Sequence, residues 1–194
     1  MIIQSRPAGA IKVGRLAMNN GDENLGRLTP FDGNEANVVI DTPRYSRNKY
    51  KLDKKSGMFM LSGVLAEGHS FPYDFGFIPG TKGEDGDELD VLVLMDQPAF
   101  VGCLLKCRLI GGIKAEQKEP KKKTERNDRL LAVASKSIEY EDISSYTDLT
   151  KKVLDQIEHF FISYNQVKGK TFTPTGRFGI AAASEIVRKA SVEK

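Results

Sequence analysis

Short apolar runs separated by Gly, Pro, Ser and Asp follow one another from residue 38 onward. Runs of this length with such boundaries are typical of short β-strands. About five or six strands of this kind favour a small antiparallel barrel, because each strand can bury one face inside it. The expected strands cover residues 38–40, 50–52, 58–61, 89–95, 104–110 and 130–134.

The spacing of the apolar residues becomes helical in the last third of the chain. A long amphipathic helix is expected behind Thr147, a candidate N-cap, and it should end near Gly169. A second helix is expected over residues 180–189, where Ala183 and Val187 share one face. The pattern therefore predicts an α+β protein whose helices pack outside a barrel.

The 194 residues, 40% of them hydrophobic, are sufficient for one domain with a real core. Residues 1–37 are rich in Gly, Asn and Asp with little periodicity, so we expect an irregular N-terminal arm, followed by a single domain over residues 38–194. No apolar run reaches the roughly 18 residues that span a bilayer, and the first residues lack the order of a signal peptide. We expect a cytoplasmic protein without membrane contact.

The net charge of +3 is concentrated, because residues 114–129 contain seven basic and four acidic residues. We interpret this stretch as a charged loop. A broad basic face, typical of nucleic-acid-binding domains, is not indicated, so a nucleic-acid partner is not expected. Cys103 and Cys107 are expected to be free thiols, since four residues of strand separate them by more than a disulfide tolerates.

Residues 83–90 concentrate the unusual chemistry of the chain, with five acidic residues in seven positions directly before an apolar strand. Crowded carboxylates repel one another unless a cation compensates. Hard carboxylate oxygens on a glycine-containing loop favour magnesium or calcium. A solvated acidic turn remains the alternative, whereas a calcium-binding EF-hand loop is excluded because its glycine position is Asp90 and its final glutamate position is Asp96.

Two cations offer the other half of a phosphate site. Lys49 and Lys51 are two positions apart in an expected strand, so both side chains point to the same face. Cations on one face could hold phosphate oxygens opposite the carboxylates. The alternative is that this face is simply the wet face of an edge strand.

The order of several sequence blocks resembles that of the family I soluble inorganic pyrophosphatases. The blocks are VVIDTP, NKYKLDKKSG, FPYDFGFIPGT, EDGDELDVLVL and FFISYNQVKGK, over residues 38–170. The resemblance implies a five-stranded barrel similar to oligonucleotide/oligosaccharide-binding (OB) folds, with helices outside. It also implies a homo-oligomer, a trimer or a hexamer.

The resemblance also implies a division of labour among the polar residues. Asp87 matches the carboxylate that takes a proton from the attacking water, and Lys51 is a further candidate for substrate binding. The water would lie between two magnesium ions and attack one phosphorus in line. The implied magnesium ligands are Asp85, Asp90, Asp128 and Asp41, and the implied phosphate-binding residues are Lys49, Tyr164 and Arg129.

Several positions depart from the family pattern. Lys51 stands in place of a glutamate, and Gly63 in place of an arginine that binds phosphate. We expect the metal site beside Lys51 to be lost and Lys51 to supply positive charge that Gly63 does not. The next expected metal ligand falls at Asn127 or Asp128, and we prefer Asp128. Further departures are Phe71 and Phe75 for tyrosines, Asn165 for a lysine and Gln117 for an aspartate.

Three functions are therefore considered. The leading hypothesis is an enzyme that uses Mg²⁺ to hydrolyse inorganic pyrophosphate to two phosphates. The first alternative is a phosphohydrolase that acts on another diphosphate, because Gly63, Phe71 and Phe75 make the cleft more open or less polar. The second is a non-catalytic OB-like module that binds RNA or a protein through its barrel and charged loop.

Overall fold

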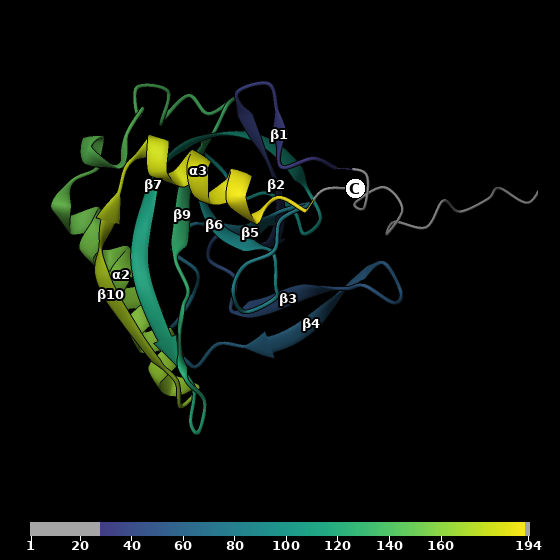
Figure 1. The fold of residues 1–194 in the computed structure, drawn as a ribbon, viewed down its shortest axis with the longest axis vertical. Helices are drawn as coiled ribbons and strands as arrows, with labels where there is room; N and C mark the ends of the chain where they lie inside the picture. The colour runs from purple at the N-terminus through teal and green to yellow at the C-terminus, as the bar shows by residue number, and fades with distance from the viewer. Residues whose placement is uncertain (1–27, 193–194) are drawn as a thin grey trace, which may run out of the picture.

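A closed ring of five strands forms the centre of the molecule in the computed structural model, which describes residues 28–192 (Figure 1). The ring runs in the order β2, β5, β6, β9, β7, and the pairing of β2 with β7 closes it. The five strands are β2 (Glu35–Thr42), β5 (Asp74–Ile78), β6 (Leu89–Leu94), β7 (Leu104–Lys118) and β9 (Arg129–Ala134). The α+β class and the five-stranded barrel are thereby confirmed.

One pair of the ring is parallel, which corrects the expectation of a wholly antiparallel barrel. β6 pairs with β9 in parallel register, Val91 opposite Leu130, whereas the other four pairs are antiparallel. The reason is geometric. Strand direction alternates around an antiparallel ring, and an odd number of strands cannot close such an alternation.

Two helices lie outside the barrel, as predicted. α2 (Lys151–Val167) and α3 (Ile180–Ala190) are joined by β10 (Thr171–Phe178), which extends the sheet beyond β7 (Figure 1). β10 was not expected from the sequence, because Pro174 and Gly176 interrupt its alternation. The register shifts between these two residues, and an irregularity of this kind is where a strand tolerates proline.

The long helix begins later than predicted, with Thr150 and not Thr147 as its N-cap. The Thr150 side chain accepts a hydrogen bond from the backbone N–H of Val153 at 3.4 Å. Thr147 lies in a separate 3₁₀ turn, η1 (Tyr146–Asp148), whose cap is Ser145. Ser145 and Asp148 form a reciprocal capping box for this 3₁₀ turn. Thr147 therefore belongs to that turn and is not the N-cap of α2.

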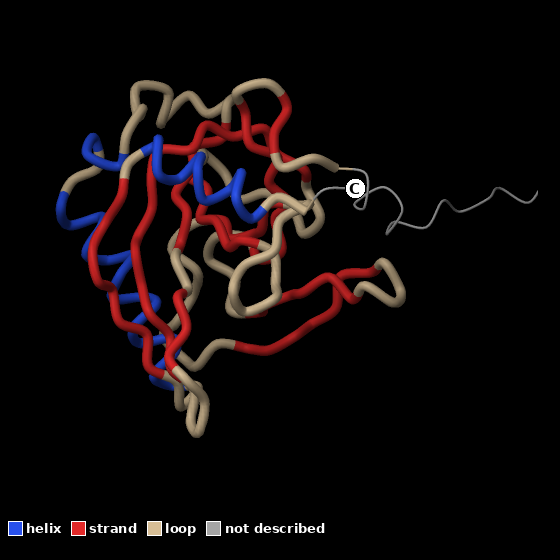
Figure 2. Tube along the Cα trace, in the orientation of Figure 1, coloured by secondary structure: helices blue, strands red, loops and turns tan. Residues whose placement is uncertain are grey.

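Two of the expected strands do not belong to the barrel. β3 (Asn48–Asp53) and β4 (Met58–Val64) form a two-stranded sheet of their own, which projects from the ring (Figure 2). Most of their side chains are exposed or only half-buried, so these strands contribute little to a core. Apolar residues such as Met58 and Met60 on the exposed side of β4 made the pattern resemble that of a core strand.

β5 was missed because the close approach of a neighbouring strand requires glycine in its centre. A Cβ atom at Gly76 would lie 2.1 Å from the carbonyl oxygen of Val39.

Two stretches expected to be irregular also contain strands. Phe31–Asp32 is β1, which pairs with the beginning of β2, and part of residues 114–129 is a hairpin of β7 with β8 (Thr124–Arg126). Residues 1–27 of the expected arm lie outside the described residues, and the division into arm and domain stays a prediction.

Two apolar clusters occupy opposite faces of the ring strands. One contains side chains of all five ring strands together with Ala183 and Val187 of α3, so it fills the barrel and α3 closes it. The other lies beneath α2 and includes Leu154, Ile157 and Phe161. Within the described chain no helix has the length and apolar character needed to cross a membrane. Cys103 and Cys107 are free thiols, as expected.

Candidate functional site

A polar cavity of about 480 Å³ lies beside β3 and the acidic segment that precedes β6. The turn after β7, the beginning of β9 and the C-terminal turn of α2 complete its walls. Of the nine residues predicted for the site, all except Asp128 line this cavity. They are Asp41, Lys49, Lys51, Asp85, Asp87, Asp90, Arg129 and Tyr164.

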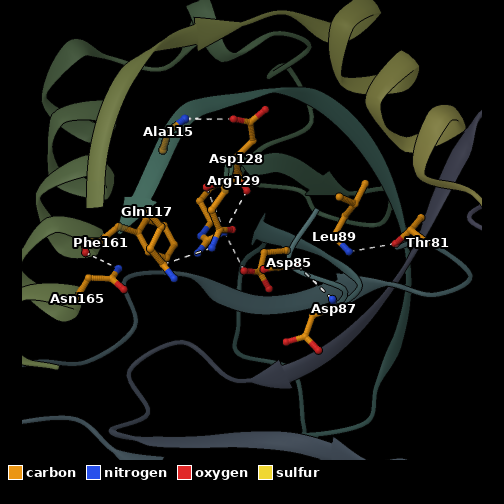
Figure 3. Close-up of polar contacts among 12 residues, drawn as sticks. Thr81, Asp85, Asp87, Leu89, Ala115, Gln117, Asp128, Arg129, Phe161 and Asn165 are labelled. Carbon is orange, nitrogen blue, oxygen red and sulfur yellow. Dashed lines mark hydrogen bonds and ion pairs between the residues drawn. The ribbon is translucent and has the colours of Figure 1, made fainter. Parts of the chain in front are cut away.

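A tight turn presents the carboxylates of the acidic segment. The Gly83 N–H donates to the Asp87 carbonyl at 2.7 Å, and Gly86 adopts a φ of 87°, which favours glycine. The Asp87 N–H donates to Asp85 Oδ1 at 3.1 Å (Figure 3). The turn therefore fixes Asp85 through a backbone contact, while the Asp87 side chain faces the cavity.

Lys51 forms an ion pair with Asp87. Its Nζ lies 2.9 Å from Asp87 Oδ2, and the side chains are 53% and 59% exposed. The hydrogen bond to Asp87 raises the pKa of Lys51, although partial burial opposes the shift. The prediction that Lys49 and Lys51 face the same way agrees with this arrangement, because both line the cavity.

Arg129 forms the second ion pair, with Asp90, at 2.9 Å between Nη1 and Oδ2. Arg129 is buried, and its guanidinium lies 5.1 Å from the ring centre of Phe161 and 5.4 Å from that of Phe172. Nη1 of Arg129 also donates to the carbonyl of Asp128 at 3.1 Å. Arg129 is thus held in place from several sides and fixes Asp90 in turn.

Asp41 is the most buried acid of the cavity. Burial raises its pKa to about 6, although the nearby charge of Lys49 and a 2.6 Å hydrogen bond from the Thr42 hydroxyl act in the opposite direction. Burial also raises the pKa of Asp85, and the charges of Asp90 and Asp87 add to this shift. The cavity therefore holds carboxylates whose ionised forms lack compensation by the protein alone.

We expect Asp41→Asn to stabilise the metal-free protein at neutral pH. Since the folded pKa of about 6 lies above the ordinary 3.8, the unfolded chain ionises first as the pH rises. Wild type therefore loses stability relative to Asp41→Asn between about pH 4 and pH 6, by about 2 to 3 kcal/mol. Urea unfolding with a chelator at several pH values should show a gap that grows over this range. An equal gap at pH 4 and pH 7 would contradict the argument.

An aromatic wall supports Lys49 and Tyr164. The Lys49 Nζ lies 4.5 Å from the ring centre of Phe75 and 5.7 Å from that of Phe71, distances at which a cation is attracted to a ring face. Tyr164 stacks on Phe160 and contacts Phe71, and its hydroxyl accepts a hydrogen bond from the Lys168 ammonium. Phenylalanines at positions 71 and 75 therefore position the ammonium of Lys49, which is predicted to bind phosphate, without themselves offering a hydroxyl.

The structure turns Asp128 away from the cavity and Asn127 toward it. Asp128 Oδ1 accepts from the Ala115 N–H at 3.1 Å (Figure 3). Its Oδ2 accepts from Arg126 Nε at 2.8 Å. Asn127 lines the cavity, and its side-chain amide donates to Gln117 Oε1 at 3.3 Å. Asp128 instead lines a second cavity, of about 260 Å³, with Asp85 and Asp90. Asp128 thus shares a cavity with the predicted ligands Asp85 and Asp90 but not with Asp41.

A charged cluster that was not expected from the sequence lies at the tip of the β7–β8 hairpin. Glu119 is paired with Lys122 at 2.6 Å and with Lys170, and these hydrogen bonds lower its pKa to about 2. All three residues line the cavity. The charges of residues 114–129 were visible in the sequence, but the contact from Glu119 to Lys170 joins distant segments.

The donor atoms of the cavity fit a hard divalent cation. Asp41, Asp85 and Asp90 offer carboxylate oxygens, and burial raises the pKa of Asp41 and of Asp85, to which the charge of Asp90 adds. Yet within residues 28–192 no three His, Cys, Asp or Glu side chains are gathered closely enough to hold a metal. Asp87 and Asp90 are each engaged by a cation of the protein. The donor oxygens are of the kind that a divalent cation prefers, but their present ion pairs do not leave a preformed metal site.

Comparisons with known proteins agree on one family. The family model described as inorganic pyrophosphatase matches residues 38–193. An inorganic pyrophosphatase of Synechocystis sp. is 38% identical over 153 residues, which cover 79% of this chain and 88% of the relative. One from Campylobacter jejuni is 36% identical over 160 residues, 81% of this chain and 90% of the relative.

Solved structures give the same result. The crystal structure of inorganic pyrophosphatase from Thermus thermophilus superposes with a TM-score of 0.79 at 33% identity, over 86% of this chain and 96% of that one. The enzyme from Helicobacter pylori gives a TM-score of 0.77 at 31% identity, over 84% and 95% of the two chains. With sequence, fold and acidic segment in agreement, the chain belongs to the inorganic pyrophosphatase family.

Proposed function

We propose that this protein hydrolyses inorganic pyrophosphate to two phosphates and that Mg²⁺ is its divalent cofactor. The observation that carries the proposal is one cavity in which Asp85, Asp87 and Asp90 face Lys49 and the other predicted cations. Carboxylates opposite cations are the two halves of a site for a metal-bound phosphate. A module that only binds other molecules has no evident use for such an acidic half.

Asp87 is the proton acceptor in this proposal. Its carboxylate is exposed to the cavity, and the turn holds its backbone through Asp85. A carboxylate in this position can take a proton from a water molecule that attacks phosphorus. Asp85, Asp90 and Asp41 would hold Mg²⁺, which neutralises phosphate charge and favours attack by water when it is bound.

Four side chains hold the phosphate oxygens. Lys49 and Lys51 approach from β3, Arg129 from the beginning of β9, and Tyr164 from α2. Because these side chains come from three separate elements, they can surround a small phosphate dianion. The aromatic wall under Lys49 excludes water from one side, which strengthens its attraction to phosphate.

Phosphate release decides between this function and its alternatives. Purified protein is incubated with pyrophosphate and separately with a panel of nucleotides, across a titration of Mg²⁺. We expect release from pyrophosphate that depends on Mg²⁺ and little from nucleotides. Preference for a nucleotide would indicate another phosphohydrolase, and no release from any substrate would leave only a binding role.

Gly63→Arg should tighten the grip on substrate. Gly63 is the direct cross-strand partner of Lys49, so a side chain there shares the face of Lys49. A Cβ atom at this position would meet no atom within 4 Å, so the fold should tolerate the change. An arginine binds phosphate with a two-pronged fork. We expect the KM for pyrophosphate to fall about tenfold, by about 1.4 kcal/mol of binding. An unchanged KM would show that this face does not reach the substrate.

The proposal includes assembly into a homo-oligomer, a trimer or a hexamer, and a cytoplasmic location. Exposed apolar side chains on β4, among them Met58, Leu61 and Val64, offer a surface that another copy could cover. Light scattering would refute assembly if it returned the mass of one chain.

The cytoplasmic location is supported by the free thiols Cys103 and Cys107, which suit a reducing compartment.

A further inference from the structure

Three carboxylates of the acidic segment are paired with cations from other parts of the chain. Lys51 pairs with Asp87, Lys54 with Glu88 and Arg129 with Asp90, each at 2.9 Å between nitrogen and oxygen. Two of the three cations come from β3 and the turn that follows it. The protein thus compensates much of its own acidic cluster.

The three pairs differ in how firmly the cation is held. The Arg129 side chain is 7% exposed and lies against two aromatic rings, so it stays with Asp90. In the Lys51 pair both side chains are more than half exposed. Exposed pairs are screened by water and contribute little to stability. A lysine also carries its charge on a flexible stem with rotatable donors.

Lys51 has a second partner within reach of the same cavity, the substrate. It lines the cavity together with Lys49 and Tyr164, which hold phosphate in the proposed function. A phosphate group carries more negative charge than one carboxylate and offers several oxygens to an ammonium group. Bound phosphate should therefore compete well with Asp87 for Lys51.

We propose that Lys51 is an exchangeable counter-ion, which neutralises Asp87 in the free protein and moves to a phosphate oxygen when substrate binds. This inference rests on the proposed function and adds a positioning role for Lys51. Asp87 becomes free to act only when phosphate occupies the cavity. In the free protein the same ammonium opposes binding of a divalent cation, so phosphate and Mg²⁺ should each favour the binding of the other.

Calorimetry on the full chain tests the exchange without relying on catalysis. Mg²⁺ is titrated into the protein alone and into protein with inorganic phosphate. For wild type we expect weak binding of Mg²⁺ alone and tighter binding with phosphate. For Lys51→Gln we expect Mg²⁺ alone to bind about tenfold more tightly, and phosphate to add less than in wild type.

Lys54→Gln is the matched control. It removes the same charge from the same cavity, and Lys54 sits as close to Glu88 as Lys51 does to Asp87. Because Lys54 is exposed and pairs with Glu88, which is neither a proposed Mg²⁺ ligand nor the proton acceptor, its loss should change Mg²⁺ affinity less than about twofold. Equal effects of the two variants would reduce the role of Lys51 to general charge and overturn the proposal. An unchanged Mg²⁺ affinity in Lys51→Gln would also overturn the proposal. Lys51→Met serves as a second variant, and circular dichroism checks that each variant folds.

The same preparations separate this inference from the proposed function. Pyrophosphate hydrolysis by wild type, with no difference between Lys51→Gln and Lys54→Gln in Mg²⁺ binding, would refute the exchange alone. Coupled binding of Mg²⁺ and phosphate that Lys51→Gln abolishes, without any hydrolysis of pyrophosphate, would refute the function and leave the exchange standing.

Discussion

Asp87→Asn is expected to lower kcat for pyrophosphate by about 10³-fold, because an amide cannot accept a proton from water. The fold should be unaffected. The Asp87 side chain is 59% exposed, and its ion pair with Lys51 is open to water, so stability should change by less than about 0.5 kcal/mol. Phosphate release and urea unfolding, measured on the same preparation, test both parts.

Glu84→Gln is the control for this variant. It removes one negative charge from the same acidic turn, but Glu84 lines the second cavity and not the proposed site. Its kcat should stay close to that of wild type. If Glu84→Gln and Asp87→Asn lost activity alike, the loss would come from the charge of the turn, and Asp87 would not be the proton acceptor.

Arg129→Ala is expected to cost about 4 kcal/mol of folding stability as well as most of the activity. The change removes a buried guanidinium, its ion pair with Asp90 and its contacts with Phe161 and Phe172. Asp90 would be left without its partner, and the space between the rings would be empty. Thermal and urea unfolding measure the first effect, and phosphate release the second.

Arg129→Lys distinguishes charge from shape at this position. A lysine keeps the positive charge for Asp90 but lacks the planar group that lies against the rings. We expect it to recover part of the stability and part of the activity. A fully stable Arg129→Ala would show that the ion pair and the ring contacts do not hold this side of the cavity together.

Local pattern was sufficient for the elements whose own residues carry a strong periodicity. The two helices were predicted with their buried faces, because apolar spacing in a helix depends only on residues a few positions apart. The apolar strand Leu89–Leu94 was predicted almost to its ends for the same reason. Strands that depend on a neighbour were missed. Position 76 in β5 must be glycine because the Val39 backbone approaches it closely. Pro174 is tolerated in β10 because the pairing with β7 is irregular there.

The parallel pair and the separate β3–β4 sheet could not be predicted in this way. Strand direction follows from closure of the ring, which is a property of all five strands together. Whether an apolar strand enters the ring depends on which partner covers it, and β4 keeps Met58 and Met60 on the surface. Neither the order of the strands along the chain nor their apolar content predicts the direction of a strand pair or the partner that covers a strand.

The sequence by itself determined the family and predicted the chemistry of the site. Crowded carboxylates at Asp85, Asp87 and Asp90 indicate a cation by charge repulsion alone, and the order of the blocks around them identifies the family. Only the tertiary structure decided which groups face one another. It turned Asp128 toward Arg126 and Asn127 into the cavity, and it placed Lys51 on Asp87. Contacts between segments this far apart depend on the path of the folded chain, whereas repulsion between neighbouring charges is already present in the order of the residues.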